Sequence, residues 1–203
     1  MCVTEGRLYL GERILKVRIG LLWLLLLVGT LLTSADPLTR LPWLAMTSAL
    51  FVLAFRLWDD LADMEYDRQH HPRRGLVRSA EVRSFHAAQW FLITALGILV
   101  LTITDGVRAL AFLGLVAFYL AMYRVTGNRP GLRPLRVSLV LVKYPTFVLL
   151  LALHPDDPVA LLAALGVYLL PLLDEVRSTG PAILLASSAI VGLAILAWLG
   201  LAT

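Results

Sequence analysis

The chain has little charge and almost no cysteine. Asp, Glu, Lys and Arg make up only 16% of its 203 residues, and Cys2 is the single cysteine. One cysteine excludes an internal disulfide. No nucleic-acid-binding motif accompanies the net charge of +4, so no nucleic-acid partner is expected. No stretch between the apolar segments is long enough for a soluble domain, and we expect residues 1–203 to form a single domain.

Hydrophobic residues fill the chain instead. They make up 59% of it, and the mean hydropathy is +0.81, which is too apolar for an ordinary soluble domain. A helix needs ~20 apolar residues to cross a bilayer. We therefore expect an all-α, polytopic bundle of about seven transmembrane helices, integral to the lipid bilayer. The expected spans are 14–34, 41–58, 84–104, 107–124, 135–154, 158–174 and 181–202.

Lys and Arg residues alternate between the two sides of these spans. The loops before span one and after spans two, four and six carry most of them, whereas the opposite loops carry only Arg40 and Arg108. By the positive-inside rule, the N-terminus is expected in the cytoplasm and the C-terminus outside. In a bacterium the membrane would be the cytoplasmic one. A secretory signal ending at 33–35 is an alternative interpretation of the N-terminus, but the long apolar run and the multi-span remainder favour a retained first span.

Four aspartates lie where the second span meets water. On a helix, Asp60, Asp63 and Asp67 fall at i, i+3 and i+7, and Asp59 lies one turn before Asp63, so the four carboxylates are expected on one face. Like charges at this spacing repel and require neutralisation. Mg²⁺ is typically held by a few carboxylates together with substrate phosphates. The spacing therefore predicts a magnesium–diphosphate site that faces the cytoplasm.

Lys143 lies within the fifth expected span. A charged group there is a functional hypothesis by default, because its burial costs ~2.5–3.5 kcal/mol. We expect Lys143 to bind the diphosphate. Snorkelling to the cytoplasmic surface is the alternative. The aspartates also have an alternative interpretation, as a solvated acidic segment partly paired with Arg56 and Arg68.

The aspartate segment carries a family resemblance. The sequence DDLADMEYD at 59–67, with RGLVRS at 74–79, resembles the first aspartate-rich motif of the UbiA superfamily of membrane prenyltransferases. That motif usually reads NDxxDxxxD and is followed by an Arg-Pro-Leu-like stretch. Its place between spans two and three also matches. The family's leading Asn is Asp59 here, and known members usually have more spans than this chain offers.

The resemblance implies a cavity open to the cytoplasm and the lipid, with Mg²⁺ and a prenyl diphosphate between two acidic motifs. The second motif is reduced here to Asp174 and Glu175. The implied metal ligands are Asp59, Asp60, Asp63, Asp67, Asp174 and Glu175, and the implied catalytic residues are Asp60, Asp63, Asp174 and Lys143. The expected diphosphate ligands are Lys143, Arg73, Arg74, Arg124 and Tyr123, of which the last two resemble the family's Tyr-and-Lys signature and also suit a membrane interface.

The implied activity is the Mg²⁺-dependent transfer of a prenyl group from a polyprenyl diphosphate to an aromatic or other lipophilic acceptor. Two alternatives stay open. A UbiA-type terpene cyclase would use the same donor without an acceptor. A non-enzymatic relative would bind a lipid, a diphosphate or a divalent cation, and the reduced second motif favours this alternative.

Overall fold

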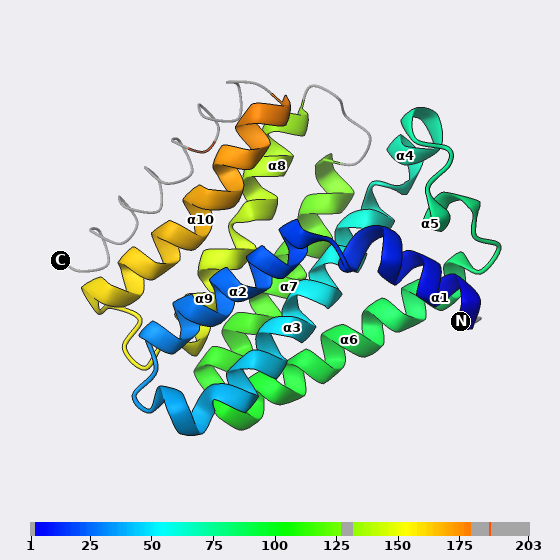
Figure 1. The fold of residues 1–203 in the computed structure, drawn as a ribbon. Helices are drawn as coiled ribbons and strands as arrows, with labels where there is room; N and C mark the ends of the chain where they lie inside the picture. The colour runs from blue at the N-terminus through cyan, green and yellow to red at the C-terminus, as the bar shows by residue number, and fades with distance from the viewer. Residues whose placement is uncertain (1–2, 127–131, 180–186, 188–203) are drawn as a thin grey trace.

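The structure is a computed structural model that describes residues 3–126, 132–179 and 187 (Figure 1). These residues form helices joined by short connections and contain no β-strand. The helices are α1 (Val3–Tyr9), η1 (Leu10–Ile14), α2 (Val17–Leu32), α3 (Pro37–Ala62), α4 (Met64–His70), α5 (Gly75–Arg78), α6 (Val82–Ile103), α7 (Gly106–Thr126), α8 (Arg133–Leu141), α9 (Lys143–Leu151) and α10 (Pro158–Thr179). The prediction of an all-helical fold is confirmed.

Three helices are long and apolar enough to cross a membrane, namely α3, α6 and α7. Glu5–Ile14 and Val17–Leu32 form a pair of helices that is bent by 72°. If this pair counts as one span, the number of spans is four. Three or four such helices are compatible with an integral membrane protein. The described part of the chain does not confirm seven.

The later expected spans explain the difference. Segment 135–154 is divided between α8 and α9, neither of which is long enough to cross alone. Segment 158–174 lies within α10 as a short apolar stretch, Pro158–Leu173. Segment 181–202 lies outside the described residues, apart from Ser187. The segments 135–154 and 158–174 are helical, as predicted, but the break at Val142 was not predicted.

Helix starts at one end of the bundle follow from local capping. The Asp105 carboxylate accepts a hydrogen bond of 2.8 Å from the Arg108 N–H at the start of α7. The Asp157 carboxylate accepts one of 2.8 Å from the Val159 N–H at the start of α10. Both satisfy amide groups that have no partner within their own helix.

The core lies between α3 and the helices around it. Helix α3 packs on α2 and α6, and α9 packs on α10 and α2. Phe51 of α3 stacks on Phe147 of α9, with ring centroids 4.1 Å apart. Gly29 of α2 permits a close approach, because a Cβ there would lie 3.2 Å from a methyl group of Val167 and 3.3 Å from one of Val148. These contacts bring α2, α9 and α10 together.

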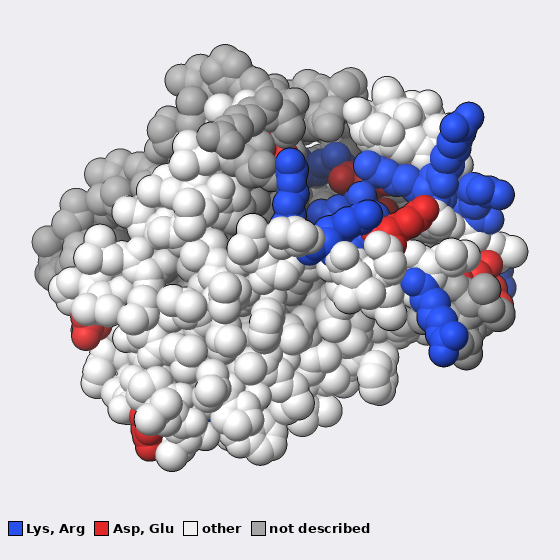
Figure 2. Space-filling view, in the orientation of Figure 1, with Lys and Arg blue, Asp and Glu red and all other residues white. Residues whose placement is uncertain are grey.

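The surface has two characters. Large apolar side chains are exposed on α6, α7 and α10, for example Phe91 at 72%, Leu113 at 59% and Leu162 at 68%. Extensive exposed apolar surface of this kind suits contact with lipid. Figure 2 shows Lys and Arg side chains gathered around a hollow at one end, while most of the remaining surface in view is neither basic nor acidic. The candidate site lies at this charged end.

Candidate functional site

The acidic segment, residues 59–67, crosses a helix junction. Helix α3 ends at Ala62, Asp63 is its C-cap, and α4 begins at Met64. The chain remains nearly helical here, because the Asp63 N–H bonds the Asp59 carbonyl at 2.9 Å and the Asp67 N–H bonds the Asp63 carbonyl at 2.9 Å. The segment therefore keeps the helical spacing on which the prediction about its four carboxylates rests. Their partners, however, come from several different elements.

Asp60 is the most heavily bonded of the four. It is 4% exposed and accepts hydrogen bonds of 3.0 Å from the Tyr9 hydroxyl and 3.0 Å from Arg13 Nε. A second nitrogen of Arg13 also contacts this carboxylate, and Arg56 Nη2 lies 3.2 Å away. The N-terminal segment is thus tied to the end of α3.

These contacts change the pKa of both N-terminal partners. Burial and the negative charge of Asp60 raise the pKa of Tyr9. Burial alone would lower the pKa of Arg13, but its hydrogen bond to Asp60 and the charge of that carboxylate together raise it. Tyr9 is therefore a neutral donor and Arg13 a permanent cation at neutral pH.

Asp59 is paired inside the bundle. Its two oxygens contact the Tyr123 hydroxyl and Lys143 Nζ. Lys143 is fully buried, and its ammonium lies 5.6 Å from the Phe55 ring centroid and 5.2 Å from that of Tyr144. Snorkelling does not describe this side chain. Lys143 is directed toward the acidic segment, and its partner there is a carboxylate.

The other two aspartates pair with arginines. Arg136 Nη2 lies 2.7 Å from Asp63 Oδ1, and Arg74 contacts the buried Asp67. The pKa of Asp63 is raised chiefly by burial and further by neighbouring carboxylates, while Arg136 opposes the shift. Each aspartate of the segment therefore has its own cationic partner.

This pairing bears on the expected metal ion. Among the described residues, no three Asp, Glu, His or Cys side chains are placed to hold a metal ion together. Carboxylate oxygens are suitable donors for Mg²⁺, but those of the acidic segment are engaged by Lys and Arg. As arranged, this donor set does not fit a resident Mg²⁺. The side chain of Asp174 lies outside the described residues, so its distance from Asp63 stays a prediction.

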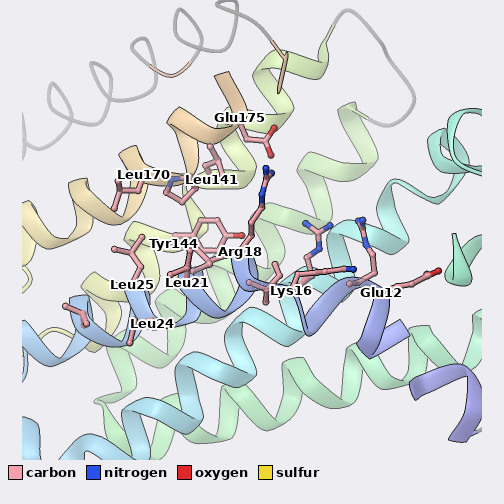
Figure 3. A pocket seen from close by; sticks show the side chains of 16 residues that line it. Glu12, Lys16, Arg18, Leu21, Leu24, Leu25, Leu141, Tyr144, Leu170 and Glu175 are labelled. Carbon is pink, nitrogen blue, oxygen red and sulfur yellow. The ribbon is translucent and has the colours of Figure 1, made fainter. Parts of the chain in front are cut away.

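A groove of about 890 Å³ opens beside the acidic segment (Figure 3). Its walls are apolar side chains of α2, α9 and α10, among them Leu21, Leu25 and Leu170. Figure 3 shows Leu24 and Leu25 toward one end of the groove and Lys16 and Glu12 toward the other. The groove is therefore amphipathic along its length.

The mouth of the groove is strongly basic. Four cationic side chains line it, Arg13, Lys16, Arg18 and Arg56, against the two carboxylates of Glu12 and Glu175. An excess of positive charge next to an apolar trough suits a ligand with an anionic head and an apolar tail.

The predicted diphosphate ligands lie elsewhere. Arg73 and Arg124 are exposed, Arg74 is paired with Asp67, and Tyr123 is bonded to Asp59. Lys143 is not among the residues that line the groove. Of the predicted second motif, Glu175 does line it. The predicted residues are thus divided between the acidic segment, the surface and the groove.

Sequence reasoning missed the role of the basic residues around the start of α2. Arg13, Lys16 and Arg18 were interpreted only as evidence of orientation, because the positive-inside rule accounts for such residues fully. The missed signal was their position, because three cations lie within six residues around the start of an apolar helix. Tyr9 gave no signal at all.

No protein-family model, no curated protein and no solved structure matches the chain.

Proposed function

We propose that this chain is a membrane prenyltransferase of the UbiA type, which takes a prenyl group from a polyprenyl diphosphate and passes it to a lipophilic acceptor. The proposal includes a cytoplasmic N-terminus and a site that faces the cytoplasm. The observation that supports it is the groove, because a basic mouth and apolar walls lie together beside the acidic segment. The motif resemblance points to the same class of donor.

The chemistry follows from the charges at the mouth. When an allylic diphosphate ionises, the bond from C1 to the diphosphate oxygen breaks and the electron pair leaves with the diphosphate. Arg13, Arg56 and Lys16 would stabilise the charge that develops on it. A nucleophilic carbon of the acceptor then bonds to C1 and loses a proton. The leucine-lined walls would hold the tail and limit the access of water to the carbocation.

Mg²⁺ dependence belongs to the proposal because the resemblance implies it, and no step above depends on the ion. The test is release of pyrophosphate from farnesyl and geranylgeranyl diphosphate by purified protein in proteoliposomes, with and without Mg²⁺. Asp63→Ala and Asp174→Ala should both abolish release, whereas Glu65→Gln, which alters an exposed side chain of α4, should not. An unchanged rate in Asp63→Ala would contradict the site assignment.

Product analysis separates the two enzymatic possibilities. A transferase forms a prenylated acceptor only when an acceptor is supplied, and a cyclase releases a terpene hydrocarbon or alcohol without one. The same incubations, extracted and examined by mass spectrometry, give this result directly.

One observation favours a second candidate, a non-enzymatic protein that binds a lipid diphosphate. The carboxylates of the acidic segment are already neutralised by cationic side chains, and the described residues offer no metal-binding group. Tight binding of farnesyl diphosphate without any release of pyrophosphate, at every Mg²⁺ concentration tested, would support this candidate over the enzyme.

A further inference from the structure

Arg13 and Arg56 take part in both the groove and the ion pairs of the acidic segment. Both line the mouth of the groove, and both hold the carboxylate of Asp60. Arg13 does so through two nitrogens, in the forked geometry that a guanidinium offers to a carboxylate or to a phosphate alike. Asp60 therefore occupies the arginines that an anionic ligand of the groove would need.

Arg56 has spare donor capacity in the same place. Its Nε is buried and has no hydrogen-bond partner among the described residues. A buried donor left unpaired is costly, and a ligand with several oxygens would satisfy it. The carboxylate of Asp60 therefore pairs with Nη2 of Arg56 and leaves its Nε without a partner among the described residues.

The Arg13–Asp60 contact is also one of several contacts that hold a strap, which we define as residues 5–14, and the Tyr9 hydroxyl of this strap bonds the same carboxylate at 3.0 Å. At its start, Glu5 accepts a hydrogen bond of 2.7 Å from the Ser79 hydroxyl. Near its end, Glu12 accepts one of 2.8 Å from the Gly75 N–H. The strap therefore lies against α5 and Ser79 through polar contacts. It also packs through the buried Tyr9 in a small apolar cluster with Leu61 and Phe85, where the ring centroids of Tyr9 and Phe85 are 5.5 Å apart.

We propose that a phosphate-bearing ligand in the groove displaces Asp60 from Arg13 and Arg56, and that this exchange loosens the strap at the acidic segment. The inference rests on the proposed function for the class of ligand, an anionic lipid phosphate, and not for turnover. A diphosphate carries more charge and more acceptor oxygens than one carboxylate, so it competes for both arginines. Displacement then frees Asp60, which links ligand binding to the state of the acidic segment.

The proposed exchange predicts that two variants change the affinity for diphosphate in opposite directions. Binding of inorganic diphosphate and of farnesyl diphosphate to the full chain would be measured by calorimetry in detergent, with metal chelated. Asp60→Asn should bind both probes about threefold or more tightly, because the internal competitor loses its charge. Arg13→Gln should bind them about tenfold more weakly, since a charge-assisted forked contact is lost.

Matched controls remove the same charges outside the groove. Glu65→Gln and Arg68→Gln disrupt an exposed pair on α4, whose partners lie 2.9 Å apart, and neither should change binding. If Arg13→Gln does not fold, Arg13→Lys keeps the charge without the fork and should weaken binding by less than tenfold. Equal or weaker binding in Asp60→Asn would overturn the inference.

The loosening of the strap is measured separately, by the reactivity of an introduced thiol. In a chain with Cys2→Ser, the thiol introduced by Ser79→Cys should react slowly with a maleimide and faster at saturating diphosphate, while the thiol of an exposed Gln69→Cys variant should react at one rate throughout. An unchanged labelling rate in the Ser79→Cys variant would overturn the coupling. These assays contain no Mg²⁺ and no acceptor, so they test binding alone. If they succeed while the proteoliposome assay with Mg²⁺ releases no pyrophosphate, the inference stands and the proposed enzyme is defeated.

Discussion

Carboxylates at the two ends of the bundle act over different distances along the chain. At one end, Asp105 and Asp157 accept hydrogen bonds from amide groups two or three residues away and cap α7 and α10. At the other, Asp59 and Asp60 bond to side chains 84 and 47 residues away. The same residue type stabilises one helix in the first case and joins separate elements in the second.

The two groups of aspartates differ in the free energy that is lost when the partner is removed. A capping aspartate is exposed, so water can replace its partner. The aspartates of the acidic segment contact cations that come from η1, the start of α5, α8 and α9. Where such a pair is buried, removing one partner leaves an uncompensated charge, which costs far more than the pair itself contributes. Variants at the two ends should therefore differ strongly in stability.

The largest effect is expected for Lys143→Met. Asp59 would keep its charge inside the bundle without an ammonium, and the loss of stability should be about 3–5 kcal/mol. Thermal unfolding in detergent measures this. The double variant Lys143→Met with Asp59→Asn should recover most of the loss, because no unpaired charge remains. A double variant no more stable than the single one would show that packing, not charge, causes the effect.

A smaller effect is expected for Arg74→Gln. Asp67 is 4% exposed and would lose its cationic partner, at a cost of about 1–3 kcal/mol. Arg73→Gln removes the same charge from the neighbouring, exposed side chain and serves as the control. Equal unfolding temperatures in the two variants would contradict the importance of the pair.

Capping at the opposite end should contribute less. Asp157→Ala removes the side-chain acceptor of the Val159 N–H and should cost about 1 kcal/mol. It should not alter the binding of diphosphate, because the change lies far from the groove along α10. Unfolding and calorimetry on the same sample measure both effects.

The smallest effect concerns pH. The pKa of Asp63 is higher in the folded chain than its ordinary value of 3.8, so the folded state takes up the proton more readily than the unfolded state. The charged form thus slightly destabilises the fold, and stability relative to Asp63→Asn should rise as pH falls from 7 through the folded pKa. The gain should stay below about 1 kcal/mol, since the side chain is 41% exposed. A relative stability that falls on acidification would contradict this sign.

The sequence predicted what local spacing determines. Helical content follows from apolar composition, and the nearness of Asp59 to Asp63 follows from helical periodicity. The cost of a charge within a span indicated that Lys143 needs a partner, but that partner is Asp59 and not the predicted diphosphate. Each of these depends on residues a few positions apart or on one residue in its own segment.

Long-range partners could not be predicted in this way. Nothing in the spacing of the aspartates indicates that Arg13 or Arg136 would neutralise them, so a metal ion was the simpler hypothesis. The break between α8 and α9 was not predicted either, because residues 135–154 were interpreted as one apolar span although Lys143 and Pro145 follow Val142. The strap depends on Tyr9, Glu5 and Glu12, whose partners lie 51 to 74 residues away.

The close approach at Gly29 limits how far an apolar tail can enter. The groove follows α2 from Arg18 to Val28, a rise of about 15 Å at ~1.5 Å per residue. The next residue, Gly29, lies against Val148 and Val167 and does not line the groove, so the lined part of α2 ends at Val28. Tails up to about 15 Å would add affinity with each further carbon, and longer ones would bend out into the lipid between α2 and α10 and add little.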